Sequence, residues 1–137
     1  DGREAVVHRK GATPAGPDAL GVIPGSMSAP GYIVRGKGNP EAMNSAAHGA
    51  GRQMSRAEAK RLFEWEEVSR RLEENKVELL SAGLDEVPMA YKDIHKVMQA
   101  QADLVEPLAE FQPRIVKMAP DSAFGRGRKG KKRKKHR

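Results

Sequence analysis

One histidine in this sequence is surrounded by residues that have almost no side chain. Residues 44–56 read NSAAHGAGRQMSR, so His48 precedes two glycines and an alanine, and arginines follow at Arg52 and Arg56. Small neighbours let a bulky phosphate come close to the backbone, and glycines allow turns that point successive N–H groups at an anion. Arginine is the residue type that grips phosphate with paired donors. This composition indicates a phosphate-binding site around His48.

Two interpretations of His48 follow from this setting. Its imidazole could attack phosphorus in nucleotidyl or phosphoryl transfer and form a phosphoramidate intermediate. The Ser-x-x-Glu pattern from Ser55 to Glu58 predicts a capped helix, whose N-terminus would favour the same negative charge. The same residue types also suit a structural, hydrogen-bonded loop histidine. Composition alone leaves both interpretations open.

Two further stretches have residue types that suit phosphate. His8, Arg9 and Lys10 are consecutive basic residues before a glycine, although a solvated loop would look the same. Residues 24–27 read PGSM, a tight turn that exposes a hydroxyl and backbone N–H groups. Residues 36–39 read GKGN but lack the glycine spacing of a Walker loop. No histidine or carboxylate pair has metal-ligand spacing, so we assign no metal ligand in this chain.

The elements that must position these residues begin with a glycine-rich zone and continue with a helical one. Residues 1–51 hold ten of the fourteen glycines, which predicts loops and short strands at residues 5–7, 21–23 and 31–34. Apolar residues at helical spacing then predict a helix over residues 56–75, with a short strand after it at residues 77–80.

A second helical stretch is expected after Pro88. Its apolar face begins at Ile94 and continues by spacing to Phe111, with a break near Asp103 because Pro107 clashes inside a continuous helix. Residues 114–118 should form a terminal strand. The predicted fold class is therefore α+β, with short strands and glycine-rich loops followed by two or three helices.

The composition bounds the class of protein. The chain has 137 residues, enough for one ordinary domain, and no cysteine for disulfide or thiolate chemistry. No apolar run is long enough to span a bilayer, so we expect a cytoplasmic protein with no membrane partner. Nine of the 25 lysines and arginines fall in residues 126–137, so the net charge of +7 belongs to the end of the chain. We expect this run to be disordered, as either a nonspecific phosphate-binding arm or a solubilising end.

Six motifs in this order resemble the carboxy-terminal part of the RtcB family of GTP-dependent RNA ligases. They are HRKGAT at residues 8–13, PGSM at 24–27, SAAHGAGRQMSR at 45–56, PMAYKDI at 88–94, QADLV at 101–105 and PRIVK at 113–117. The resemblance covers residues 1–118, which we interpret as the carboxy-terminal, nucleotide-binding part of an RtcB-type fold. Residues 119–137 form a basic tail in this interpretation.

The resemblance implies a ligase that joins an RNA 3′-phosphate or 2′,3′-cyclic phosphate end to a 5′-hydroxyl end, in RNA repair or tRNA splicing. In the family, the histidine of the HGAG motif attacks the α-phosphorus of GTP with the aid of Mn²⁺ and carries GMP to the RNA 3′-phosphate. That histidine corresponds to His48. The manganese ligands would lie upstream of Asp1, so we expect this piece alone to be inactive. RNA ends and GTP are the implied partners, and we expect a monomer.

Further site residues are implied by their positions in the motifs. Nucleotide contacts are implied for Gly25, Ser26, Met27, Ser28, Gly49, Ala50, Gly51, Tyr91 and Lys117. Contacts with phosphate or RNA ends are implied for His8, Arg9, Lys10, Arg52 and Arg56. The sequence departs from the family at residues 28–31, where SAPG replaces GT-x-S, and at Met118, where the family has a glycine. A non-catalytic RNA-binding or RNA-repair protein that retains the fold is the alternative.

Overall fold

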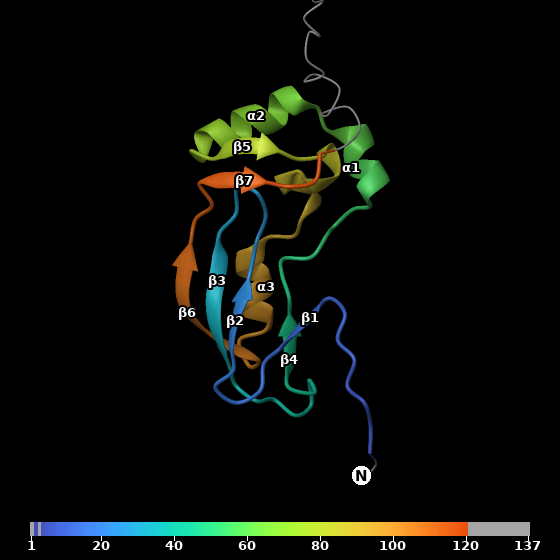
Figure 1. Ribbon diagram of the computed structural model, residues 1–137, viewed down its shortest axis with the longest axis vertical. Helices are drawn as coiled ribbons and strands as arrows, with labels where there is room; N and C mark the ends of the chain where they lie inside the picture. The colour runs from blue at the N-terminus through green and yellow to red at the C-terminus, as the bar shows by residue number, and fades with distance from the viewer. Residues whose placement is uncertain (1, 3, 121–137) are drawn as a thin grey trace, which may run out of the picture.

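The computed structural model describes Gly2 and residues 4–120, and within them short strands gather in three small sheets beside three α-helices (Figure 1). The α+β prediction is confirmed. None of the helices in this described part of the chain is long and apolar enough to cross a membrane. In chain order the elements are β1 (Ala12–Pro14), β2 (Leu20–Ile23), β3 (Gly31–Gly36), β4 (Ser45–Ala47), α1 (Arg56–Leu62), α2 (Trp65–Glu74), β5 (Glu78–Ser81), the 3₁₀ turns η1 (Leu84–Glu86) and η2 (Pro88–Ala90), α3 (Ile94–Ala100), β6 (Val105–Phe111) and β7 (Ile115–Lys117).

The largest sheet is antiparallel and has the strand order β2–β3–β6. It packs on α3, because Ile23, Val34 and Val105 of the strands share one buried cluster with Ile94 and Met98 of the helix. β1 pairs antiparallel with β4, and β5 pairs parallel with β7 beneath α2 in Figure 1. Strand pairing therefore joins β3 and β5 to strands near the end of the described chain, while α1 and α2 lie between β4 and β5 in the sequence.

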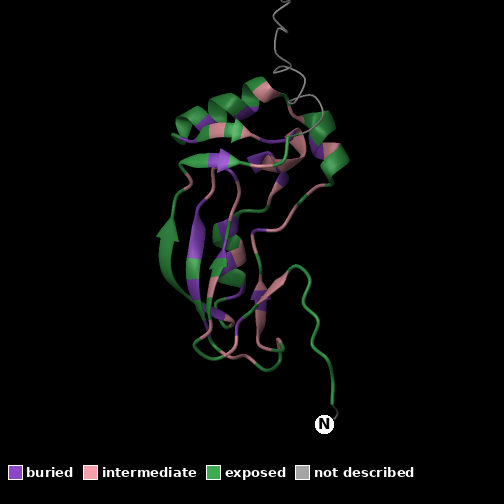
Figure 2. Ribbon diagram, viewed as in Figure 1, coloured by how far each residue is buried: buried purple, intermediate pink, exposed green. Residues whose placement is uncertain are grey.

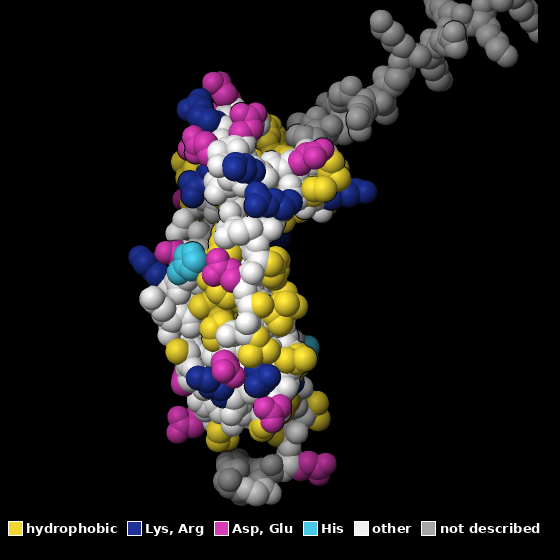
Figure 3. All heavy atoms as spheres, turned by 90° about the vertical axis from the view of Figure 1, so that its left-hand side faces the viewer, with side chains coloured by type: hydrophobic (Ala, Val, Ile, Leu, Met, Phe, Trp, Pro, Cys, Tyr) yellow, Lys and Arg dark blue, Asp and Glu magenta, His cyan; other side chains and the backbone are white. Residues whose placement is uncertain are grey.

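The strands of the largest sheet also carry exposed apolar side chains. Leu20 and Val22 on β2, Ile33 on β3, and Leu108 and Phe111 on β6 are all exposed. Figure 3 shows hydrophobic side chains gathered over the middle of the molecule on the side where β6 lies. Among the residues that the structure describes, no element covers these side chains.

Two buried clusters stabilise the two ends of the molecule (Figure 2). The first lies between the largest sheet and α3, and the second lies among α1, α2 and the β5–β7 pair. Ile94 in the first and Val68 in the second are fully buried, and burial of each such side chain stabilises the fold by about 1.5–3 kcal/mol. The half-buried Tyr91 packs against both clusters and so marks their junction.

The prediction of one helix over residues 56–75 is wrong, because α1 and α2 are separated by extended backbone at Phe63 and Glu64. In one continuous helix, Ala59 and Val68 would point about 180° apart at 3.6 residues per turn. Both side chains are instead fully buried in the same cluster. The break changes the phase of the second helix so that the apolar faces of both helices meet one core.

The prediction that the second helical stretch continues to Phe111 is also wrong, because α3 ends at Ala100 and residues 105–111 form the edge strand β6. The apolar spacing fits a helix, but a proline clashes in a helix interior. An edge strand tolerates Pro107, which is paired with Val34 where the register of β3 and β6 shifts. Because the partner strand β3 lies far earlier in the sequence, no local pattern predicts this pairing.

The remaining predictions of secondary structure have mixed outcomes. The strands predicted at residues 21–23, 31–34, 77–80 and 114–118 are confirmed, with shifts of up to two residues, as β2, β3, β5 and β7. Residues 5–7 form no strand, and Val6 is almost completely exposed. The sequence does not predict β1 and β4, since each has three residues and depends on the other for pairing. The basic run at residues 126–137 lies outside the described residues.

Candidate functional site

Predicted site residues from separate loops meet around one pocket of about 430 Å³. The loop after β2, the loop after β4 with the start of α1, and the residue after η2 supply them. The predicted residues that line the pocket are Gly25, Ser26, His48, Gly49, Ala50, Gly51, Arg52, Arg56 and Tyr91. The structure therefore brings the histidine, both arginines and the small residues to one place.

Three residues implied to contact nucleotide lie outside this lining. Met27 is buried in the second core, and Ser28 lines a neighbouring pocket. Lys117 is exposed on β7, and the next residue, Met118, lines the His48 pocket instead. The sequence does not predict Met118 as a lining residue. Its position directly after the motif lysine is the signal that could have found it.

The three basic residues implied to contact RNA or phosphate near the start of the chain are exposed and lie outside the pocket lining. These are His8, Arg9 and Lys10. Arg9 donates from Nε to Ser45 Oγ at 2.8 Å and from Nη2 to the carbonyl oxygen of Met43 at 3.2 Å. These bonds connect the segment before β1 to the strand that leads to His48.

Two hydrogen bonds hold the backbone on either side of His48. The N–H of Ala47 donates to Oε1 of the buried Gln101 at 2.8 Å, and the N–H of Ala50 donates to the carbonyl oxygen of Pro24 at 3.1 Å. The His48 side chain is exposed, and its ring makes no hydrogen bond to any described residue. A structural loop histidine is held in place through its ring nitrogens. The geometry therefore favours a ring that is available to a ligand.

Gly51 connects the His48 loop to the segment that carries Tyr91. Its φ of +73° lies in the left-handed region that favours glycine. The carbonyl oxygen of Gly51 accepts the N–H of Lys92 at 2.9 Å, and Arg52 pairs with Tyr91 in an isolated antiparallel bridge. The two segments that line opposite parts of the pocket are thus joined through their backbones.

Gly25 has a packing role in addition to its implied nucleotide contact. A Cβ at this position would clash with the carbonyl oxygen of Pro30 and lie 3.0 Å from Cβ of Ala29. We expect Gly25→Ala to lower the free energy of unfolding by about 1–3 kcal/mol through overpacking, measured by urea denaturation. Gly16→Ala is the control, because a Cβ there meets nothing within 4 Å. Equal unfolding free energies for the two variants would contradict the packing role.

Arg52 has one N–H group that the protein leaves unpaired. Its guanidinium lies over the Tyr91 ring, with Cζ 5.2 Å from the ring centroid. Nε donates to the carbonyl oxygen of Met54 at 3.2 Å, and Nη1 donates to the Tyr91 hydroxyl at 3.4 Å. Nη2 is buried and has no partner among the described residues. Because a buried donor without an acceptor is unfavourable, this nitrogen is a candidate donor to a ligand of the pocket that Arg52 lines.

Arg56 is already paired with carboxylates of η1. Its Nη1 donates to Asp85 Oδ2 at 2.6 Å and also to Glu86 Oε1. The hydrogen bond to Glu86 and then the one to Asp85 raise the pKa of Arg56 above its already high usual range. Lys60 Nζ adds a second cation 3.7 Å from Asp85 Oδ1. One nitrogen of Arg56, Nη1, is therefore paired with protein carboxylates rather than available to a ligand.

Glu86 links the two arginines to Tyr91. Its second oxygen accepts a hydrogen bond from the Tyr91 hydroxyl and lies 4.0 Å from Nη1 of Arg52. Burial raises the pKa of Tyr91, and the hydrogen bond to Glu86 raises it further. Tyr91 thus stays protonated at neutral pH and keeps donating to Glu86, which holds the ring beneath the Arg52 guanidinium.

The Asp85 pairing predicts a pH-dependent contribution to stability. Burial acts to raise the pKa of Asp85, but the hydrogen bond from Arg56 and the other charges outweigh it, so the pKa is lowered in the folded state. Since the folded pKa lies below the unfolded one, the stabilisation is present above about pH 4 and is lost as the pH falls through the folded pKa. Asp85→Asn should lower the free energy of unfolding by about 1 kcal/mol at pH 7. In urea denaturation at pH 7, 5 and 3, the difference from wild type should shrink at pH 3, and a constant difference would contradict the pairing.

The described residues do not supply a metal site. Within Gly2 and residues 4–120, no three histidine, cysteine, aspartate or glutamate side chains lie close enough together to hold a metal ion. These residues therefore do not fit the Mn²⁺ that the family resemblance implies.

Comparison with known proteins supports the sequence resemblance. A family model described as tRNA-splicing ligase RtcB matches residues 1–119. The chain is 51% identical over 105 residues to the RNA-splicing ligase RtcB of Escherichia coli K12. The aligned region covers 77% of this chain and 26% of that protein. It is 38% identical over 134 residues to the tRNA-splicing ligase RtcB of Nanoarchaeum equitans, covering 81% of this chain and 28% of the relative.

A bacterial relative from another lineage has a similar match. The chain is 36% identical over 131 residues to the RNA-splicing ligase RtcB of Mycobacterium bovis, covering 81% of this chain and 30% of that protein. The chain thus spans between about a quarter and a third of the length of these three relatives.

Proposed function

Because the chain belongs to the RtcB family, we propose that the full-length protein is a GTP-dependent RNA ligase and that this part carries its nucleophile. The ligase joins an RNA 3′-phosphate or 2′,3′-cyclic phosphate end to a 5′-hydroxyl end. The observation that carries the proposal is the shared pocket of His48 and Arg52. Both residues line this pocket. The His48 imidazole is exposed, and neither the imidazole nor the buried Nη2 of Arg52 has a hydrogen-bond partner among the described residues.

The proposed chemistry uses His48 as a nucleophile. A ring nitrogen attacks the α-phosphorus of GTP, so that a P–N bond forms while the bond to the leaving pyrophosphate breaks. The GMP group then passes from His48 to the RNA 3′-phosphate, which restores the histidine. Attack of the RNA 5′-hydroxyl on the activated phosphate joins the strands and releases GMP. Small residues beside His48 leave the open approach that the bulky phosphorus centre needs.

Other residues of the pocket bind the nucleotide in this proposal. Arg52 Nη2 donates to an oxygen of the α-phosphate, which satisfies the buried donor. The backbone of residues 49–51 lies along the same pocket and approaches the phosphate closely. Tyr91 contributes a wall held by Glu86. The assignment of Lys117 to guanine recognition rests on its motif, because its side chain is exposed on β7 outside the pocket lining.

Covalent labelling tests the proposal directly. Full-length protein is incubated with GTP labelled at the α-phosphate, with MnCl₂ or with EDTA, and the protein is then separated by denaturing electrophoresis. We expect label on the protein in MnCl₂, stable in alkali and lost in acid, as a phosphoramidate requires. ATP labelled at the α-phosphate is the control for nucleotide choice. RNA binding without any label would contradict the ligase and favour the non-catalytic RNA-binding alternative.

A further inference from the structure

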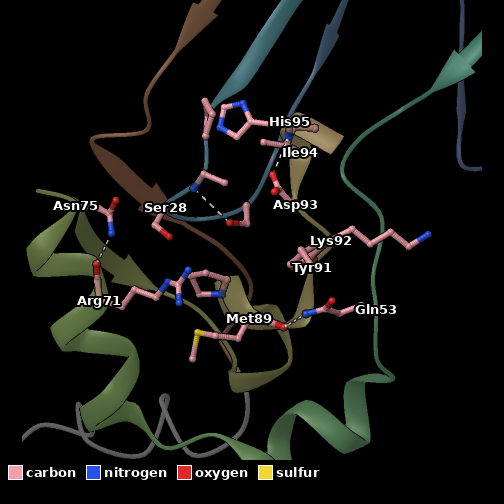
Figure 4. Close-up of a pocket in the computed structure, with 14 residues that line it drawn as sticks. Ser28, Gln53, Arg71, Asn75, Met89, Tyr91, Lys92, Asp93, Ile94 and His95 are labelled. Carbon is pink, nitrogen blue, oxygen red and sulfur yellow. Dashed lines mark hydrogen bonds between the residues drawn. The ribbon is translucent and has the colours of Figure 1, made fainter. Parts of the chain in front are cut away.

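A second pocket, of about 480 Å³, lies next to the His48 pocket (Figure 4). It is formed by the loop after β2, the carboxy-terminal half of α2, η2 and the start of α3. Ser26 and Tyr91 line both pockets, so a ligand in one would be a neighbour of a ligand in the other. Of the residues that line this second pocket, only Tyr91 has a role in the nucleotide chemistry proposed above.

The polar groups that face this pocket include unpaired donors. Figure 4 shows Arg71 and Asn75 of α2 on one side of it, with Ser28 between them and Asp93 of the α3 cap. The Arg71 guanidinium and the Ser28 hydroxyl make no hydrogen bond to any described residue. Asp93 accepts the N–H of His95 at one oxygen, which leaves its other oxygen able to accept a second donor.

The charge balance of the pocket suits a single phosphate group. Arg71 brings one positive charge and Asp93 one negative charge, while the Lys92 side chain runs away from them in Figure 4. One guanidinium with a hydroxyl and an amide can bind a phosphodiester, and a free carboxylate oxygen can accept a sugar hydroxyl. A triphosphate would need more positive charge than one arginine supplies. Met89 and Ile94 add an apolar wall against which a sugar or base can pack.

We propose that this second pocket binds one ribonucleotide unit, a phosphodiester with its ribose, of the RNA strand whose end is joined. The assignment rests on the proposed function, because it takes the guanylate to occupy the neighbouring His48 pocket. In this arrangement Arg71 and Ser28 hold the phosphate, and Asp93 accepts a ribose hydroxyl. The 2′-hydroxyl is the group through which a protein can distinguish RNA from DNA at such a site.

Arg71 and Arg70 offer a matched pair for the test. They are neighbours on α2 with equal charge, and both are exposed. Arg71 lines the pocket, whereas Arg70 does not and pairs with Glu66 at 3.4 Å. Full-length Arg71→Gln and Arg70→Gln are compared with wild type by fluorescence anisotropy on short RNA strands that end in a 3′-phosphate or a 5′-hydroxyl. The salt concentration is held constant, because contacts with phosphate depend on it. Thermal melting confirms that both variants are folded.

We expect Arg71→Gln to weaken RNA binding about tenfold, as for loss of one hydrogen-bonded charge pair, and Arg70→Gln to change it less than about twofold. A methylphosphonate, which removes the charge of one linkage, is then moved along the strand. At one linkage the methylphosphonate should weaken RNA binding by wild type. At the same linkage it should leave RNA binding by Arg71→Gln unchanged, since both changes remove the same contact. Covalent labelling by GTP should be unchanged in both variants.

Three results would overturn the assignment. These are equal losses of affinity for the two variants, additive effects of Arg71→Gln and the methylphosphonate at every linkage, and loss of GTP labelling in Arg71→Gln with RNA affinity intact. The third result would place the guanine nucleotide in this pocket. If wild type takes no label while the Arg71 and linkage effects are as expected, the ligase proposal fails and the RNA site is supported.

Discussion

Replacement of His48 by alanine should abolish covalent labelling of the full-length protein by α-labelled GTP. The side chain is exposed in the pocket and makes no hydrogen bond to a described residue, so its removal takes away the nucleophile and little else. No other histidine lines this pocket, within the part of the chain that the structure describes. We expect the labelling rate to fall on the order of 10³-fold or more, as for loss of a nucleophile in other enzymes.

Two measurements accompany the His48→Ala variant. Its thermal midpoint should match that of wild type, because the backbone bonds around residue 48 do not involve the ring. RNA binding by anisotropy should also persist, since the binding surface remains. Labelling of His48→Ala at the wild-type rate would show that another residue carries the nucleotide and that the assignment of His48 is wrong.

The second large effect separates the two arginines that the sequence treats alike. Arg52→Ala should lower the labelling rate on the order of 10²-fold, because it removes a positioned donor from the phosphate site. Arg52→Lys should recover little of that loss, since an ammonium cannot reproduce the planar guanidinium that lies over Tyr91 and carries the unpaired Nη2. Arg56→Ala should affect labelling by less than about tenfold, because the Arg56 guanidinium is already held by Asp85 and Glu86 through Nη1.

Arg56→Ala, which should affect labelling little, should have a measurable effect on stability. Arg56→Ala leaves two half-buried carboxylates without their main partner and should lower the free energy of unfolding by about 1 kcal/mol. Labelling rates come from a time course of label incorporation, and unfolding free energies come from urea denaturation of the same preparations. A larger loss of labelling in Arg56→Ala than in Arg52→Ala would contradict the roles assigned from the geometry.

The sequence identifies residues that the fold brings to one pocket, but it does not predict the contacts between them. The small residues, the histidine and the two arginines are local signals, and the pocket does gather them. The pairing of Arg56 with Asp85 joins residues that lie in different elements, so no spacing rule shows it. The unpaired Nη2 of Arg52 is equally invisible in the sequence, because it depends on burial by the surrounding fold. Only the structure therefore distinguishes the arginine with a buried unpaired donor, Arg52, from the one paired with carboxylates, Arg56.

The fold has the same division between local and non-local information. α1 begins where its capping pattern predicts, with Ser55 Oγ accepting the N–H of Glu58 at 3.1 Å. The end of α1 depends instead on bringing Ala59 and Val68 into one core, which is a tertiary requirement. Strand β6 likewise depends on the register of β3, which accommodates Pro107 at the sheet edge.

Tyr91 lies at the junction of the two cores and also lines the His48 pocket, so a ligand bound in this pocket couples the stability of one core to that of the other. Tyr91 packs on both clusters, Ala50 of the pocket belongs to the first, and Met118 packs on the second. A ligand held there gains its contacts only while both cores are folded, so it stabilises them by the same mass-action term. With a ligand in the pocket, the two cores should therefore unfold together as one cooperative unit.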